Sequence, residues 1–206
     1  WNEYTWADYG RNAKYAGLGL MSLGLERGDV CSIAAEICKE WLFADLGIVC
    51  AGAITNGVYP TDVSNQVEYL VNDSGTRFYF AEDEEQLDKI LDVRDNTPSL
   101  EKIIIFDMEG LRKFEDDMCI SFQTLLELGE AYEAEHPEAW ITSINASDAE
   151  DLLTLTYTSG TTGRPKGAMI SHRNMLYMMI TLQRVCGILE SDEQVGFLPL
   201  AHVAGR

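Results

Sequence analysis

Residues 100–107, LEKIIIFD, contain three consecutive isoleucines followed by a phenylalanine. A short, continuous β-branched run is typical of a strand that is buried on both faces, as in a parallel sheet. Because neither face of such a strand meets water, other elements must cover it on both sides. The stretch therefore predicts that this chain is built around a buried parallel sheet.

The segments before this run alternate between strand-like and helix-like patterns. Strands are predicted at 30–34, 53–59, 77–81 and 100–107, with helices at 38–51 and 82–93 between them. A further helix is predicted between Ser64, as its N-cap, and Gly75, where it stops. The β-α-β-α-β-α-β order predicts an α/β fold, with a mostly parallel sheet and helices on both faces.

The segments after the run are less regular. A helix is predicted at 122–135, a polar segment at 145–150 is either a boundary or a connection, and 152–158 returns as a strand. Ser171 is expected to cap another helix, whose apolar residues fall on one face and are predicted to pack in the core. These residues are Met175, Met178, Met179, Leu182, Val185, Cys186 and Leu189.

Charge is distributed unevenly along the 206 residues, which have a net charge of −19. Residues 1–150 contain 30 acidic and 10 basic side chains, whereas residues 151–206 contain 4 acidic and 5 basic side chains. Nucleic-acid binding needs clustered Lys and Arg, so the acidic part argues against a nucleic-acid partner. The nearly neutral last quarter is the better place for an anionic ligand.

The five cysteines are odd in number and show no C-x-x-C spacing, so we expect reduced cytosolic thiols that are buried as small apolar side chains. The apolar stretch at 41–53 is interrupted by Asp45 and is too short to span a bilayer. The chain starts at Trp1 and ends on an apolar run, which favours a piece of a longer protein, cut at both ends. We expect a cytoplasmic protein, with peripheral membrane contact of the full protein left open.

Residues 154–167, TLTYTSGTTGRPKG, combine glycines, hydroxyl residues and a lysine. Glycine allows successive backbone N–H groups to converge on an anion, hydroxyls add donors, and Lys166 and Arg164 add positive charge. A loop that leaves a strand is a common place for a phosphate site in an α/β sheet. The candidate nucleotide-binding residues are Thr158, Ser159, Gly160, Thr161, Thr162, Gly163 and Lys166.

This loop differs from the common pattern G-x-x-x-x-G-K-[ST], in which the lysine opens a helix. Pro165 precedes Lys166 and Gly167 follows it, which argues against a helix start and therefore against a kinase or GTPase. From the residues alone, a plain hairpin between two strands remains an alternative.

The stretch YTSGTTGRPKGAMISHRN, residues 157–174, resembles the signature of the AMP-forming acyl-CoA synthetase superfamily. FLPLAHVAGR, residues 197–206, is similar to the next motif of that family, in the acyl-substrate pocket. Residues 57–89 look most like the long-chain fatty-acid branch. The resemblance covers nearly the whole chain and is strongest over 152–206. It implies that residues 1–206 are part of an N-terminal adenylation domain, without the C-terminal domain.

The resemblance implies a fatty-acid ligase that uses ATP, Mg²⁺ and coenzyme A and makes an acyl-adenylate before the thioester. It implies that the loop holds the β- and γ-phosphates, that Lys166 offsets their charge, and that His202 lines the carboxylate pocket. A loop threonine is a possible Mg²⁺ contact, but the sequence does not identify the metal ligands. His172 is expected to be structural, at a helix start, and His136 to lie on the surface.

Ala204 and Gly205 replace the bulkier or charged residues often found in the fatty-acid branch, which weakens the assignment of chain length. Several motifs that the family needs for catalysis are absent, so the fragment is expected to be inactive alone. The alternatives are a ligase for an aryl, short-chain or amino acid, a nucleotide-binding relative without catalysis, and an interaction module. The expected partners are small-molecule substrates.

Overall fold

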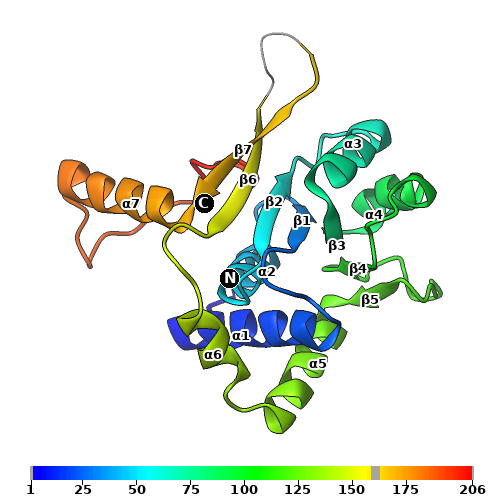
Figure 1. The fold of residues 1–206 in the computed structure, drawn as a ribbon, viewed down its shortest axis with the longest axis horizontal. Coiled ribbons are helices and arrows are strands. Elements are labelled where there is room, and N and C mark those ends of the chain that lie inside the picture. The colour runs from blue at the N-terminus through cyan, green and yellow to red at the C-terminus, as the bar shows by residue number, and fades with distance from the viewer. Residues whose placement is uncertain (1, 159–162, 206) are drawn as a thin grey trace.

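A computed structural model describes residues 2–158 and 163–205 of the chain. Its centre is a seven-stranded sheet of order β5-β4-β3-β1-β2-β6-β7 (Figure 1). The strands are β1 (Val30–Ala34), β2 (Ile54–Val58), β3 (Thr76–Ala81), β4 (Lys102–Ile105), β5 (Cys119–Ser121), β6 (Leu152–Thr158) and β7 (Lys166–Ser171). Neighbouring strands are parallel except for β6 and β7, which form an antiparallel pair.

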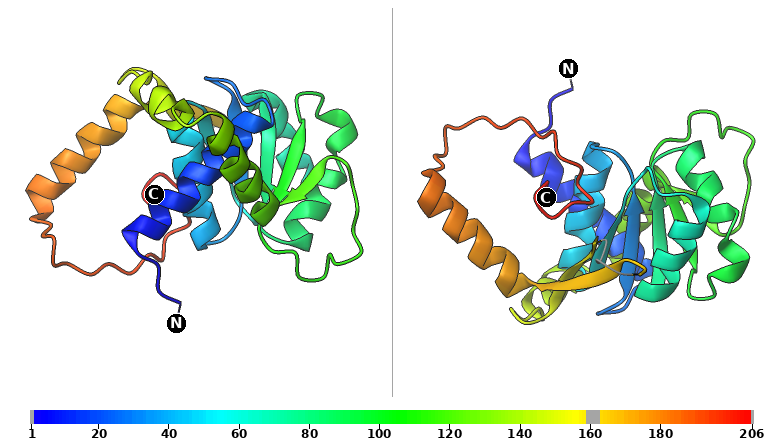
Figure 2. Two further views of the ribbon diagram at one scale, coloured as in Figure 1. Left: turned by 90° about the horizontal axis from the view of Figure 1, so that it is seen from below. Right: turned by 90° about the horizontal axis from the view of Figure 1, so that it is seen from above.

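Helices cover the sheet on both faces (Figure 2). The helices are α1 (Trp6–Ser22), α2 (Lys39–Cys50), α3 (Ser64–Ser74), α4 (Glu84–Leu91), the short 3-10 helix η1 (Arg94–Asn96), α5 (Phe122–Glu135), α6 (Ala139–Asn145) and α7 (His172–Cys186). Buried residues of α1, α2 and α5 share one hydrophobic core, and those of α3 and α4 share a second. The predicted α/β class, mostly parallel with helices on both faces, is confirmed.

Strand β3 shows how one sheet serves two cores. Phe78 and Phe80 point into the first core, whereas Tyr79 and Ala81 point into the second. All four are fully buried. Successive strand residues face opposite sides, so a strand between two helix layers has no polar face. Burying each large side chain contributes about 1.5–3 kcal/mol.

The predicted order of elements from β1 to β4 is confirmed, and three predicted spans match the structure at both ends: 30–34, 122–135 and 152–158. The predicted end at Ala81 also matches, and the other ends from β1 to β4 differ by one or two residues. The helical stripe predicted to reach Leu189 continues past the last residue of α7, Cys186. The helix expected at 82–93 begins at Glu84 because Asp83 is its N-cap, with the Asp83 carboxylate accepting from the Gln86 N–H at 3.0 Å.

The predicted cap of α3 is wrong by one residue. Val63 is the N-cap, and the Gln66 side chain accepts the Val63 N–H at 3.0 Å. Ser64 is already helical, and its hydroxyl donates to Asp92 at 3.1 Å. The predicted stop at Gly75 is confirmed, because this residue takes the left-handed conformation, with φ +68°, that favours glycine.

Helix α1 is not predicted by the sequence analysis, although Thr5 and Asp8 form a capping box at its start. Glycines let α1 approach its neighbours closely. A Cβ on Gly17 would lie 2.7 Å from the carbonyl oxygen of Gly47 in α2, and one on Gly129 of α5 would lie 1.9 Å from that of Tyr15. Because glycine lowers helix propensity, these positions are explained by tertiary packing rather than by local preference.

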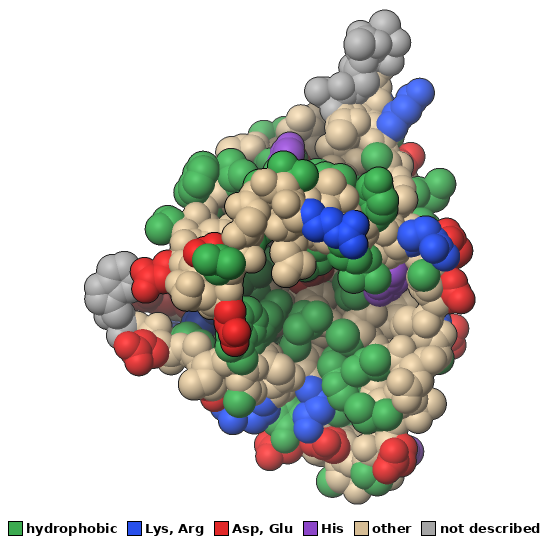
Figure 3. All heavy atoms as spheres, turned by 90° about the vertical axis from the view of Figure 1, so that its left-hand side faces the viewer, with side chains coloured by type: hydrophobic (Ala, Val, Ile, Leu, Met, Phe, Trp, Pro, Cys, Tyr) green, Lys and Arg blue, Asp and Glu red, His purple; other side chains and the backbone are tan. Residues whose placement is uncertain are grey.

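The core role predicted for the apolar stripe of α7 is wrong within the described residues. The helix extends away from the sheet (Figure 1), and none of its described side chains is buried. Met178 is 53% exposed and Val185 is 78% exposed. Hydrophobic side chains gather on this side of the molecule (Figure 3). The periodicity correctly predicts an amphipathic helix, but no described element covers its apolar face.

All five cysteines are free, but they are not uniformly buried. Cys31 is buried, Cys38, Cys50 and Cys119 are half-buried, and Cys186 is exposed on α7. The expectation that all are buried is therefore wrong for Cys186. Among the described helices, none combines the length and the apolar character that a membrane crossing requires.

Candidate functional site

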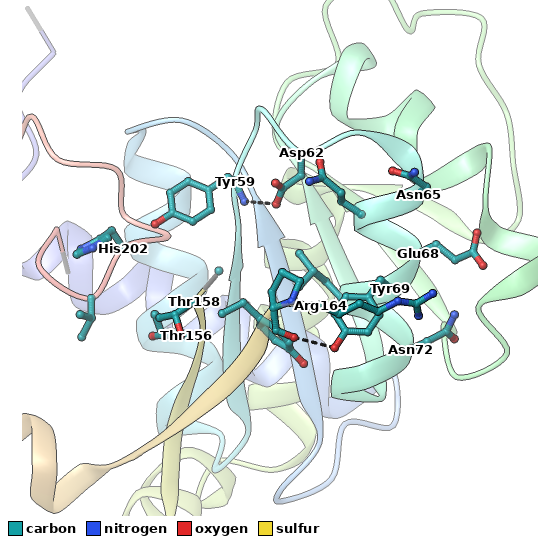
Figure 4. Close-up of a pocket in the computed structure, with 16 residues that line it drawn as sticks. Tyr59, Asp62, Asn65, Glu68, Tyr69, Asn72, Thr156, Thr158, Arg164 and His202 are labelled. Atoms are coloured by element: carbon teal, nitrogen blue, oxygen red, sulfur yellow. Dashed lines mark hydrogen bonds between the residues drawn. The ribbon is translucent and has the colours of Figure 1, made fainter. Parts of the chain in front are cut away.

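A cavity of about 880 Å³ lies at the carboxyl ends of the neighbouring strands β2 and β6. Its walls come from the turn after β2, helix α3, the β6–β7 hairpin and the segment 199–205 (Figure 4). In parallel α/β sheets, ligands bind beyond the carboxyl ends of the strands, where the connecting loops diverge. The cavity is therefore in the position where this fold is expected to hold a ligand.

The segment 199–205 is seated directly on the end of β2. Leu200 and Ala201 are buried, and a Cβ added to Gly57 would lie 2.7 Å from the Cα of Ala201. No side chain other than hydrogen fits between the strand and this segment. Gly57 therefore allows the close approach that brings His202 to the cavity wall.

The two ends of the candidate phosphate loop meet across the hairpin. Thr158, the last residue of β6, pairs with Lys166, the first residue of β7. Gly163 has φ +107°, a conformation that favours glycine. The lysine starts a strand, so the prediction that no helix begins at Lys166 is confirmed. The expected ligand residues Ser159, Gly160, Thr161 and Thr162 lie outside the described residues.

Of the described residues from Thr158 to Lys166, three line the cavity: Thr158, Arg164 and Pro165. Lys166 is not among the lining residues, but it is exposed and lies directly opposite Thr158. Paired residues of an antiparallel ladder project from the same face, so Lys166 and Thr158 share a face of the hairpin. The structure thus brings the predicted lysine to the edge of the cavity rather than into its wall.

His202 lies at the opposite end of the cavity from Arg164 (Figure 4). Its Nδ1 accepts the backbone N–H of Ala204 at 3.1 Å. In the neutral imidazole this contact places the proton on Nε2, which leaves Nε2–H as the donor. His172 opens α7, and His136 is exposed, with its ring centroid 4.4 Å from that of Tyr132 and the planes tilted by 44°. Both lie outside the residues that line the cavity.

Several lining residues are missed by the sequence analysis. They come from the turn after β2 and from the polar side of α3: Tyr59, Asp62, Asn65, Glu68, Tyr69 and Asn72 (Figure 4). The available signal is helical spacing, because these α3 residues alternate with the buried residues Val67, Leu70 and Val71. Spacing identifies a polar face, but only the fold shows that this face lines a cavity.

Asp62 is the partly buried acid of this wall. Its carboxylate accepts the Tyr59 N–H at 3.2 Å (Figure 4). Burial raises its pKa, an effect that the Tyr59 hydrogen bond and the charge of Lys89 oppose. With Glu68 it places negative charge in the cavity, whereas Arg164 supplies positive charge beside the loop. The cavity therefore has both signs of charge on different walls.

The described residues contain no group of three or more His, Cys, Asp or Glu side chains placed to hold a metal ion. A magnesium ion at this site would therefore rely on ligands other than such a cluster. Mg²⁺ in nucleotide sites usually keeps several waters and binds through substrate phosphates with one or two protein oxygens.

Comparison with known proteins gives the family. Residues 1–206 match the family described as AMP-binding enzyme. The long-chain-fatty-acid–CoA ligase ACSBG2 of Xenopus laevis is 30% identical over 211 residues, and FadD15 of Mycobacterium bovis, also named a long-chain-fatty-acid–CoA ligase, is 29% identical over 208. Both alignments cover 100% of this chain but only 28% and 33% of the relatives. The chain thus spans about a third of the length of these proteins.

Solved structures agree in fold. Anthranilate CoA ligase AuaEII, in complex with anthranoyl-AMP, has a TM-score of 0.73 at 27% identity, over 89% of this chain and 32% of that chain. A putative long-chain-fatty-acid CoA ligase from Rhodopseudomonas palustris has a TM-score of 0.78 at 23% identity, over 98% of this chain and 46% of that chain. At that identity the second match concerns the fold alone. Because the family match extends over all of residues 1–206, the chain belongs to the AMP-binding enzyme family.

Proposed function

We propose that the protein containing this chain activates a long-chain fatty acid with ATP and then transfers the acyl group to coenzyme A. The observation that carries the proposal is one cavity with Arg164 and Thr158 of the loop and, at its other end, His202. The relatives named long-chain-fatty-acid–CoA ligases support the choice of substrate.

The proposed reaction has two steps. A carboxylate oxygen of the fatty acid attacks the α-phosphorus of ATP, the bond from that phosphorus to the bridging oxygen breaks, and pyrophosphate leaves. The sulfur of coenzyme A then attacks the acyl carbonyl carbon and loses its proton, and the carbon–oxygen bond to AMP breaks. The products are the thioester, AMP and pyrophosphate.

The residues of the loop suit the first step because they concentrate donors and positive charge where pyrophosphate develops. In the proposal, Arg164 and Lys166 offset the charge of the β- and γ-phosphates, and the other loop residues bind their oxygens. The latter are Thr158, Ser159, Gly160, Thr161, Thr162 and Gly163. His202 donates from Nε2 to the oxygens near the α-phosphate, a role that its Nδ1 contact with Ala204 prepares.

Mg²⁺, when bound, neutralises charge on the transferring phosphate. The hydroxyls of the loop are chemically suited to one contact with it. The described residues contain no acidic group of three that would form a dedicated site, so no protein ligand is assigned. Coenzyme A enters as a substrate of the second step, and no described residue is assigned to it.

A second candidate is the same chemistry with another carboxylate, whether aryl, short-chain or an amino acid. The solved structure with anthranoyl-AMP bound, at 27% identity, favours keeping an aryl acid in the comparison. The proposal places the protein in the cytoplasm, because the free cysteines suit a reducing compartment. Its partners are small molecules, and the acidic residues 1–150 disfavour nucleic acid.

The test is carboxylate-dependent exchange between ATP and radiolabelled pyrophosphate, with the full-length protein and a panel of long-chain, short-chain, aryl and amino acids. Maximal exchange with long-chain fatty acids is expected. A maximum with another acid would keep the chemistry and replace the substrate. No exchange with any acid, from a folded protein that binds ATP, would favour a relative without catalysis.

The chain 1–206 alone is expected to give no exchange, because it spans only about a third of its relatives. Exchange by residues 1–206 at the rate of the full-length protein would contradict this expectation.

A further inference from the structure

Helix α3 presents two side chains to the β6–β7 hairpin, Tyr69 and Asp73, which are four residues apart and so lie on one face of the helix. The Tyr157 hydroxyl donates to the Asp73 carboxylate at 2.8 Å. The Tyr157 ring meets the Tyr69 ring edge to face, with centroids 6.4 Å apart and planes at 82°. The strand that enters the candidate loop is therefore fastened to α3 one residue before Thr158.

The same helix face also holds the chain where it leaves the loop. The Tyr69 hydroxyl donates to the carbonyl oxygen of Pro165 at 2.7 Å (Figure 4). The Arg164 guanidinium lies over the Tyr69 ring, 5.1 Å from its centroid. Tyr69 thus contacts residues on both sides of the loop, an aromatic ring on one side and a backbone carbonyl and a cation on the other.

The outer part of the β6–β7 hairpin needs such a support, because β6 is hydrogen-bonded to β2 only near the start of the strand. Strand β6 pairs with β2 at Thr55–Thr154 and Asn56–Leu155, and no later residue of β6 is paired with β2. Tyr157 and Pro165 lie beyond these pairs. Gly167 pairs with Tyr157, and a Cβ on Gly167 would lie 3.1 Å from the Tyr157 ring. The glycine leaves room for the ring to lie against β7.

We propose that Tyr69 and Asp73 of α3 are positioning residues, which hold the two chain segments that flank the phosphate loop, at Tyr157 before it and at Pro165 after it. The predicted effect on ATP binding rests on the proposed function, whereas the contacts of Tyr69 and Asp73 with the hairpin do not depend on it. Arg164 is oriented by the same contact, because its guanidinium lies on the Tyr69 ring while the residue lines the cavity. The polar side of α3 therefore serves the loop as well as the cavity wall.

The kinetic test uses the full-length protein with Tyr69→Phe, Tyr157→Phe, Asp73→Ala and Asp73→Asn. Each of the first three loses one hydrogen bond, so KM for ATP should rise roughly 3- to 10-fold. KM for the carboxylate should stay within a factor of two. Asp73→Asn should recover most of the affinity, because its amide oxygen can still accept from Tyr157.

A double variant separates a shared contact from two independent effects. Tyr157→Phe and Asp73→Ala remove the same hydrogen bond, so the double variant should resemble the stronger single variant. The matched control is Tyr177→Phe, at a tyrosine of α7 that is 71% exposed and does not line the cavity, and it should change neither KM. Equal rises in both KM values, together with a lower melting temperature, would indicate general destabilisation and overturn the proposal.

A measurement independent of activity is hydrogen–deuterium exchange of peptides that contain residues 163–168. Exchange in these peptides should be faster in Tyr69→Phe and Tyr157→Phe than in the wild type and the Tyr177→Phe control. If the wild-type protein lacks ATP–pyrophosphate exchange, the proposed function fails, and this measurement still decides whether α3 positions the hairpin. Unchanged deuterium exchange with unchanged KM for ATP would overturn the inference.

Discussion

Gly57→Ala is the substitution that most directly tests how the cavity is assembled. The added Cβ would lie 2.7 Å from the Cα of Ala201 and 3.0 Å from its carbonyl oxygen. Carbon atoms ordinarily approach to about 3.5–4.0 Å, so the segment 199–205 must move by about 1 Å. His202 follows Ala201 directly and must move with it. A misplacement of about 1 Å in a catalytic site can cost on the order of 100-fold in rate.

The assay is kcat/KM for carboxylate-dependent ATP–pyrophosphate exchange by the full-length protein, together with its melting temperature. Gly57→Ala should lower kcat/KM on the order of 100-fold. It should also destabilise the fold by about 1–3 kcal/mol, the usual cost of overpacking. The matched control is Gly10→Ala in α1, where a Cβ would meet nothing within 4 Å. Because alanine favours a helix over glycine, this control should keep its activity and gain up to about 1 kcal/mol. Wild-type kinetics for Gly57→Ala would refute the argument that this glycine seats His202.

Three further outcomes are expected. Lys166→Ala in the full-length protein should slow adenylate formation roughly 10- to 1000-fold, the range for losing one electrostatic group, and unchanged single-turnover rates would remove the lysine from the mechanism. The hydrogen bond and the charge of Arg94 lower the pKa of Asp116 in the folded protein below its ordinary value of 3.8. The ionised carboxylate therefore stabilises the fold above pH 3.8, and this contribution is lost as pH falls through the lowered pKa. Melting curves should therefore show that Asp116→Asn is less stable than the wild type at pH 7 and that this deficit shrinks as pH falls below 3.8. A deficit that does not change with pH would contradict the titration. Phe80→Ala, at a fully buried ring, should cost about 3–5 kcal/mol in chemical unfolding, against less than about 0.5 kcal/mol for Phe197→Ala at a side chain that is 75% exposed. Similar losses for both would contradict the described core.

Much of the sheet can be predicted from the sequence because its strands are short apolar runs between clear helical periods. Residues 30–34 and 152–158 have the same bounds in prediction and structure. Helix α1 is different, because Gly17 and Gly19 weaken its local helical signal and make sense only against α2 and α5. The helix propensity of the local sequence carries no information about a contact with a helix that is more than 100 residues away.

The site is predicted only in part. The loop motif predicts Thr158 and Lys166 as candidate site residues, and the PLAH segment predicts His202. That Thr158 and His202 line one cavity is a property of the fold. Tyr69 and Asp73 look like ordinary polar residues of an amphipathic helix, since spacing alone does not show that hairpin residues 84 to 96 positions later lie beside them.

The prediction for α7 shows a related limit. Periodicity correctly gives one apolar face, but it does not say which element covers that face. In the described residues the helix projects from the sheet, and Met179 is 59% exposed. A core assignment based on periodicity alone is therefore safe only where the fold places a neighbour.

The most direct test of the central claim follows an oxygen atom. The full-length protein is incubated with ATP, coenzyme A and a long-chain fatty acid labelled with ¹⁸O in both carboxylate oxygens, and the nucleotide product is analysed by mass spectrometry. If the carboxylate attacks the α-phosphorus, the product is AMP that contains one ¹⁸O atom, formed in equal amount to the thioester. Unlabelled AMP, or ADP together with labelled inorganic phosphate, would contradict the account.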